Sequence, residues 1–262
     1  MNKILLTLSA VLLFLTSCEK VVNINLNNAS PQYVVEGVVY AGTDTARVRL
    51  AKTTDYYGIS PQQIQTHATV TLSDDVGNSV VLPYIVWDSC YQLPGFTAIS
   101  GRKYSIHVLV DGLTIQGSST LQPPVPIDSV SIVYKTDGFR GAGYEVATNI
   151  SDPANTPNYY RLVTTINDTL QNQPKDLYLF NDKYNDGKHI RTALKRRFKS
   201  GDKITLELRT MDAAVYDFFT SLRDALNNQN GPAPANPNTN LIGGALGYFG
   251  TFARSKVSII VP

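Results

Sequence analysis

The sequence predicts an all-β protein built from two immunoglobulin- or fibronectin-like β-sandwich domains, the second of which carries one amphipathic helix. Short segments rich in β-branched and aromatic residues recur along most of the chain, and many alternate between apolar and polar side chains. Turn signals separate these segments at the short intervals typical of sandwiches. A proline-rich linker at residues 123–126 divides the strands into two groups, because proline disfavours ladder pairing and stiffens the backbone.

Residues 1–17 have the layout of a signal peptide. An apolar run from Ile4 to Leu15 follows Lys3, and at about 12 residues it is too short to cross a bilayer, which takes roughly 20. The run ends in the letters LTSC, with Cys18 last, and this ending resembles the lipobox of bacterial lipoproteins. The resemblance implies cleavage before Cys18 and lipidation at Cys18, so that the protein is anchored to a membrane without spanning it. The alternative is an ordinary secretory signal followed by a cysteine by chance.

The N-terminal sandwich is predicted over residues 32–122, after a polar, asparagine-rich tether at residues 18–31. Within the tether, the stretch VVNINL could pair as a first strand. The turn at Asp111-Gly112 favours a tight hairpin because glycine accepts positive φ. The predicted strands are YVVEGVVY (33–40), ARVRLAKT (46–53), ATVTLSDD (68–75), SVVLPYIV (79–86), KYSIHVLV (103–110) and LTIQGSSTLQ (113–122).

The chain contains two cysteines, and one of them, Cys18, is assigned to lipid. No intrachain disulfide is therefore expected, and the fold must be held by its core. Cys90 lies in the mixed stretch VWDSCYQL, and we interpret it as a half-buried strand residue and not as a nucleophile.

The C-terminal sandwich is predicted over residues 127–262, and a boundary at the prolines predicts that fragments 30–122 and 126–262 each fold alone. An amphipathic helix is predicted at residues 211–228, with Thr210 as a possible N-cap. We expect it to pack on its own sheet, and the asparagine- and proline-rich loop after it to be exposed. The predicted strands are SVSIVYKT (129–136), GYEVATNI (143–150), NYYRLVTTI (158–166), KDLYLFND (175–182) and KITLELRT (203–210).

A glycine-rich segment, NLIGGALGYFG, leads into the final strand. It is not expected to bind phosphate, because no Lys-Ser/Thr pair follows and no helix start is signalled. The glycines are better explained by close backbone approach or by a bulge. Tyr248 and Phe249 are candidate recognition residues, although a structural role for this segment is the favoured interpretation.

No residue pattern predicts catalysis, a cofactor or a metal site. His67, His107 and His189 lie in unrelated segments without zinc-ligand spacing, and His107 is expected to face solvent from a strand. The stretch DKYNDGKHIRTA (182–193) is superficially similar to a calcium loop, but Tyr184 and an alanine stand where oxygen ligands are needed. We interpret it as a hairpin turn. A hydrolase whose carboxylate pair forms only in the fold is a less favoured alternative.

The formal net charge of +2 is too small to indicate a nucleic-acid partner. The basic run at residues 195–199 is interpreted as a solvated loop or strand edge.

Several stretches resemble a known family. They are the lipobox followed by EK, the opening YVVEG, and then SDPANTPNYYRL, NDKYNDGK and NLIGGALGYFG. Together they resemble an uncharacterised family of Bacteroidetes outer-membrane lipoproteins of the DUF4249 type. The resemblance implies an outer-membrane address, display at the cell surface, and a TonB-dependent receptor as partner. The resemblance assigns no functional residue. Surface-export signals in that phylum are usually acidic just after the cysteine, whereas Glu19 and Lys20 carry opposite charges.

Two classes of function follow. The first is a binding or accessory lipoprotein, anchored to the outer membrane and working with a TonB-dependent receptor in nutrient uptake. The 15 tyrosines favour this class because amphipathic rings serve recognition. The alternative is a structural or adhesive surface lipoprotein. The sequence identifies no ligand.

Overall fold

The computed structural model describes residues 30–54, 62–136, 141–227 and 236–262. The predicted signal peptide, Cys18 and nearly all of the tether lie outside these residues. The strands are β1 (Tyr33–Tyr40), β2 (Gly42–Lys52), β3 (Gln63–Ile64), β4 (Thr69–Asp74), β5 (Ser79–Leu82), β6 (Tyr84–Ile85), β7 (Cys90–Ala98), β8 (Lys103–Val110), β9 (Leu113–Thr120), β10 (Ser129–Lys135), β11 (Gly143–Ser151), β12 (Tyr159–Ile166), β13 (Thr169–Leu170), β14 (Tyr178–Asn181), β15 (His189–Ala193), β16 (Lys203–Met211), β17 (Leu241–Ile242) and β18 (Leu246–Ile260). The helices are α2 (Ala213–Asn227) and the 3-10 turns η2 (Val86–Asp88) and η3 (Pro174–Asp176).

The alternating segments form strands because alternation places one apolar face against a core. In β8 the side chains of Tyr104, Ile106, Val108 and Val110 are buried while His107 is exposed. The predicted all-β class with one α-helix is confirmed for the described residues, and so is the solvent-facing position of His107.

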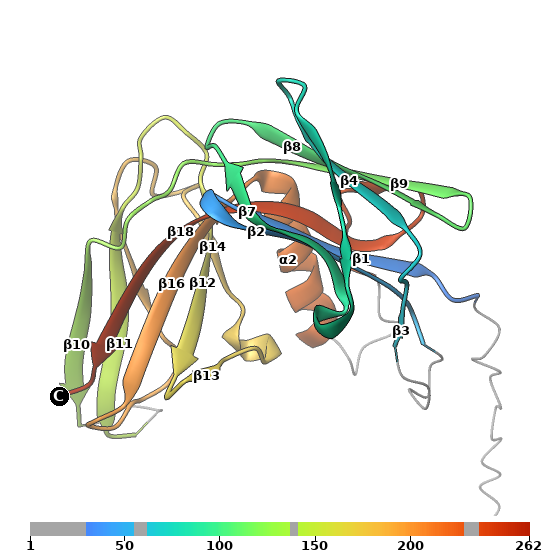
Figure 1. Cartoon of the computed structure of the whole chain (residues 1–262). Coiled ribbons are helices and arrows are strands. Elements are labelled where there is room, and N and C mark those ends of the chain that lie inside the picture. Colours follow the sequence, from blue (N-terminus) through green and yellow to red (C-terminus); the bar gives the residue numbers. More distant parts are fainter. Residues whose placement is uncertain (1–29, 55–61, 137–140, 228–235) are drawn as a thin grey trace, which may run out of the picture.

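The described strands form three sheets. The long sheet has the order β13-β12-β16-β18-β1-β2-β7-β6, with β14 and β3 paired at its side. The two smaller sheets have the orders β17-β9-β8-β4-β5 and β10-β11-β15. Figure 1 shows the smaller sheets over different parts of the long sheet, so that two sandwiches share one continuous sheet.

Strand β18 joins the two sandwiches. Its first half pairs in parallel with β1, from Val34↔Leu246 to Tyr40↔Phe252, and its second half pairs antiparallel with β16. On one face of β18, Phe249 belongs to the core of the first sandwich, whereas Val257 packs on the core of the second. The strand therefore contributes to both cores.

This pairing corrects the predicted division of the chain. The sequence predicts residues 241–252 to belong to the C-terminal sandwich at 127–262, but β17 pairs with β9 and the first half of β18 pairs with β1. These residues complete the N-terminal sandwich. The linker at 123–126 packs against the fold, since Val125 is buried and Thr210 Oγ1 donates to the carbonyl of Pro123 at 2.9 Å.

Helix α2 covers the face of the long sheet opposite to the one that carries Phe249, inside the bend of the sheet (Figure 1). Val215, Phe218 and Phe219 are buried there in a cluster with Phe252. The helix begins after Asp212, whose Oδ1 accepts the backbone N–H of Val215 at 2.9 Å. The predicted helix is confirmed, but the N-cap is Asp212 and not Thr210, because Asp212 supplies the carboxylate that satisfies a free N–H in the first turn.

We expect fragments 30–122 and 126–262 to be largely disordered when each is made alone. The first fragment lacks β17 and β18, so the core around Phe249 stays open, and the second exposes the same side chain to water. Circular dichroism and two-dimensional NMR of each fragment, and of their equimolar mixture, test this expectation. Ordered structure should form only in the mixture, and dispersed spectra from each isolated fragment would contradict it.

Candidate functional site

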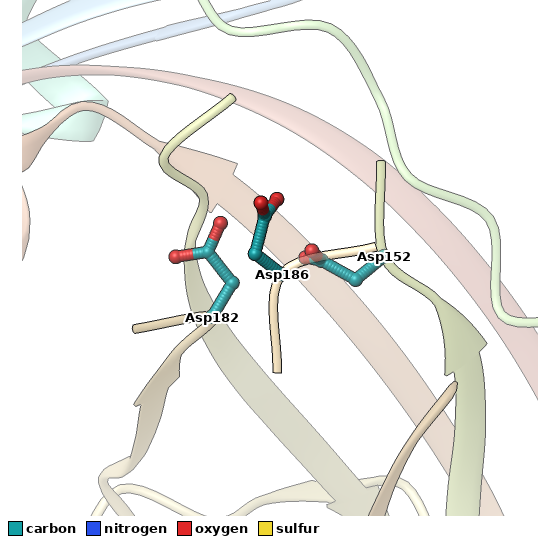
Figure 2. A group of neighbouring side chains, drawn as sticks. All are labelled: Asp152, Asp182 and Asp186. Carbon is teal, nitrogen blue, oxygen red and sulfur yellow. The ribbon is translucent and has the colours of Figure 1, made fainter. Parts of the chain in front are cut away.

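Three aspartates lie together at one end of the second sandwich. Asp152 directly follows β11, Asp182 directly follows β14, and Asp186 lies in the connection between β14 and β15. One carboxylate oxygen of each lies within 4.8 Å of the others. Figure 2 shows the three carboxylates side by side. We call these residues the aspartate cluster.

Hydrogen bonds hold each carboxylate in place. Asp152 accepts the Tyr160 hydroxyl and, at 3.1 Å, the backbone N–H of Gly187. The carboxylate of Asp182 accepts the backbone N–H of Asn158 at 2.8 Å, and that of Asp186 accepts the backbone N–H of Asn155 at 2.9 Å. Asp152 and Asp182 are each only 6% exposed, whereas Asp186 is exposed.

The cluster carries negative charge without a basic partner. Among the described residues, every ion pair of a lysine or arginine with a carboxylate lies elsewhere. Burial raises the pKa of the Tyr160 hydroxyl, and its hydrogen bond to Asp152 and the charges of Asp152 and Asp182 raise it further. Tyr160 therefore stays protonated and acts as a donor to the cluster.

The interpretation of residues 182–193 as a hairpin turn is wrong. β14 pairs with β12 in the long sheet and β15 pairs with β11 in a small sheet, so this segment crosses between the two layers. Sequence reasoning missed the cluster because it tested one contiguous calcium-loop pattern. The available signal was an aspartate placed directly after each of two strands.

A serine, a histidine and an aspartate also meet, on the exposed edge of the second sandwich. Ser151 Oγ donates to Asp128 Oδ2 at 2.7 Å and lies 3.1 Å from His189 Nδ1. In a catalytic triad the carboxylate orients the histidine and the histidine accepts the serine proton. Here the carboxylate contacts the serine, and among the described residues no hydrogen bond joins Asp128 to His189, so the carboxylate–histidine contact of a triad is missing. This arrangement is a surface hydrogen-bond network.

The turn η2 presents an exposed apolar tip. Val86 is 72% exposed and Trp87 is 84% exposed. An exposed tryptophan is a candidate contact residue, because tryptophan is enriched among the residues that contribute most to binding. Trp87 was not singled out from the sequence, although it is the one tryptophan of the chain. We call Val86 and Trp87 the η2 tip.

Of the candidate recognition residues, Phe249 is buried in a core and Tyr248 is partly buried. Phe249 is 0% exposed in the core of the first sandwich. Tyr248 is partly buried on the opposite face, where its ring stacks on Phe218 with the ring centroids 4.6 Å apart. Burial raises the pKa of Tyr248 to about 12. Both side chains pack against the fold as described, which favours the structural role.

Cys90 and the basic run at residues 195–199, which the sequence analysis also considered, form no functional site in the described structure. Cys90 is buried, more deeply than expected, and burial raises the pKa of its thiol, which disfavours the reactive thiolate. In the basic run, Lys195, Arg196 and Lys199 are exposed, while Arg197 pairs with Glu145. Within the described residues, none of the helices has the length and apolar character needed to cross a membrane.

The domain of unknown function DUF4249 matches residues 19–258. A search of curated proteins finds no match. Among solved structures, the chain is similar to a two fibronectin type-III domain segment from chicken tenascin, with 14% sequence identity, 70% of this chain and 93% of that chain covered, and a TM-score of 0.23. Such a distant similarity adds nothing on function, and the sandwich architecture rests on the strand pairing.

Proposed function

The chain belongs to the DUF4249 family, whose domain has no known function, and from this premise we propose that it is a lipid-anchored outer-membrane protein. In this proposal the protein is displayed at the cell surface and acts as an accessory or binding component of a TonB-dependent receptor in nutrient uptake.

The anchor is supported by the start of the chain. The family match begins at residue 19, directly after Cys18. The first described strand begins at Tyr33, so the chain between Cys18 and the sheet can reach at most roughly 50 Å. A lipid on Cys18 would therefore hold the folded part close to the membrane surface.

The observation that carries the proposed partner contact is the η2 tip. Tyr33 pairs with Lys52, and Val48 pairs with Tyr91, so the start of β1 and the turn before β7 lie at the same end of the long sheet. The exposed Trp87 thus stands at the end where the anchored segment enters. A partner embedded in the same membrane is within reach of this tip.

An accessory role accounts for this arrangement better than catalysis does. The thiol of Cys90 is buried, and Ser151 has no histidine oriented by a carboxylate, so both lack the activation that a nucleophile needs. The alternative, a structural or adhesive surface protein, shares the anchor but requires no receptor. Recovery of a receptor separates the two.

The test is affinity purification of the tagged full-length protein from detergent-solubilised outer membrane. We expect a TonB-dependent receptor to co-purify, and we expect Trp87→Ala to reduce its recovery by about tenfold or more, as for loss of an aromatic hot spot. Tyr134→Ala, which changes a 55% exposed aromatic in the other sandwich, serves as the control and should leave recovery unchanged.

Fluorine NMR of the protein made with 5-fluorotryptophan gives a second readout, because Trp87 is the single tryptophan of the chain and the receptor carries no label. The Trp87 signal should shift in a complex reconstituted with unlabelled receptor. If no receptor is recovered with the wild-type protein, the structural or adhesive alternative is favoured. Equal recovery with Trp87→Ala would remove the η2 tip from the proposal.

A further inference from the structure

We propose that the aspartate cluster, together with the side-chain oxygen of Asn158, binds one divalent cation of the calcium class. The inference concerns Asp152, Asp182 and Asp186 and is independent of the proposed receptor partner.

The local charge of the aspartate cluster favours a bound cation. Three carboxylates within 4.8 Å of one another, two of them almost fully buried, repel each other strongly when ionised. No lysine or arginine of the described residues forms an ion pair with them. A bound dication would offset this repulsion, as buried charges need a partner or a metal.

A buried side-chain oxygen without a hydrogen-bond partner lies beside the cluster. Asn158 is only 4% exposed, and its Oδ1 accepts no hydrogen bond. A buried polar atom without a partner is uncommon and costs free energy unless something satisfies it. An amide oxygen is also a usual calcium ligand.

Strand register directs the Asn158 side chain to the cluster. Tyr159 pairs with Asn181, so Asn158 stands opposite Asp182, and Asp182 N–H donates to the Asn158 carbonyl at 3.3 Å. Opposite residues of an antiparallel pair project to the same face, with Cβ atoms about 5 Å apart. Tyr160, two residues along β12 and hence on that same face, reaches Asp152 with its hydroxyl.

The type and number of the ligand atoms favour calcium. All four candidate ligands are oxygens, the donor type preferred by calcium and magnesium. Calcium takes about six to eight oxygen ligands in flexible geometry, whereas magnesium keeps several waters and is usually bound by one or two carboxylates. Three carboxylates and one amide oxygen therefore suit calcium better than magnesium, and carboxylate oxygens within 4.8 Å of one another can belong to one coordination sphere.

The cation would have a way in and a structural effect. A surface cavity of about 510 Å³ is lined by Asp182 and Asp186, among others, and leaves room for entry and for water ligands. Asp152 follows a strand of the small sheet, while Asp182 and Asn158 flank strands of the long sheet. One bound ion would therefore tie both layers of the second sandwich together at this end.

Thermal unfolding and calorimetry of the metal-free full chain with CaCl₂ test the proposal. We expect calcium to bind with measurable heat and to raise the melting temperature by about 5 to 10 °C at a hundredfold excess over the dissociation constant. Asp182→Asn and Asp186→Asn keep an oxygen that can accept their backbone hydrogen bonds and should abolish this rise. In EDTA both variants should melt at or above the wild-type temperature, because a like charge has been removed.

Two further variants sharpen the result. Asn158→Ala removes a side-chain oxygen that has no protein partner, so it should leave melting in EDTA nearly unchanged and weaken calcium binding by about tenfold or more. Asp168→Asn changes an exposed aspartate of a turn outside the cluster and should behave as wild type.

Three outcomes would overturn the proposal. The first is the absence of binding up to about 10 mM calcium, a concentration above the dissociation constants of weak extracellular calcium modules. The second is undiminished binding in Asp182→Asn and Asp186→Asn. The third is a larger stabilisation by MgCl₂ than by CaCl₂.

Discussion

Gly247→Ala is expected to destabilise the protein by about 4 kcal/mol or more, a large fraction of the stability of an ordinary domain. Gly247 has φ +96°, and a Cβ atom built there would lie 2.0 Å from the carbonyl oxygen of Val35. That oxygen belongs to β1, the parallel partner of β18. The clash can be relieved only by moving two strands apart, because both atoms are held by backbone.

Gly244→Ala is the matched control. Gly244 also has positive φ, +75°, but a Cβ atom there would meet nothing within 4 Å. Its cost should be only the conformational strain of about 1 to 2 kcal/mol. Urea unfolding of both variants separates the contributions, and equal losses would show that the contact between β1 and β18 is not tight.

These glycines illustrate what could be predicted from sequence. Four glycines within eight residues predicted close backbone approach or positive φ, and three of them have positive φ. The sequence could not identify the partner strand, because β1 lies at the other end of the chain. A parallel pairing over that separation leaves no turn signal between the two strands.

The strands could be predicted from the sequence because the alternation of apolar and polar residues is a local property. β8 and α2 could be located from residue periodicity alone, since burial of one face is imposed on each element separately. The division into domains could not be predicted in the same way. The prolines at 123–126 do mark the change from one group of strands to the next, but residues 241–252 return to the first group.

The aspartate cluster could not be predicted for a similar reason. Asp152 is separated from Asp182 by three strands, β12, β13 and β14, and the antiparallel register that places Asn158 opposite Asp182 becomes visible only in the fold. The η2 tip is different, because a lone tryptophan in a short segment could have been noted as a contact residue. Its exposure, however, depends on the turn between β6 and β7.

Cys18→Ala is expected to have the largest effect on where the protein resides. If the thiol of Cys18 carries the diacylglycerol, its removal leaves no lipid attachment point and no cleavage before residue 18. The precursor should remain uncut and the outer-membrane fraction should lose the protein. Cys90→Ala is the control, since it removes the chain's other cysteine, which is buried in the first sandwich.

We propose that the protein works at a membrane to which Cys18 holds it. The most direct test of this anchoring is metabolic labelling with a clickable fatty acid, followed by gel analysis of the wild-type protein and of the two cysteine variants. The account predicts label on the wild type and on Cys90→Ala, and none on Cys18→Ala. Label that persists on Cys18→Ala, or a wild-type protein that takes up none, would contradict it.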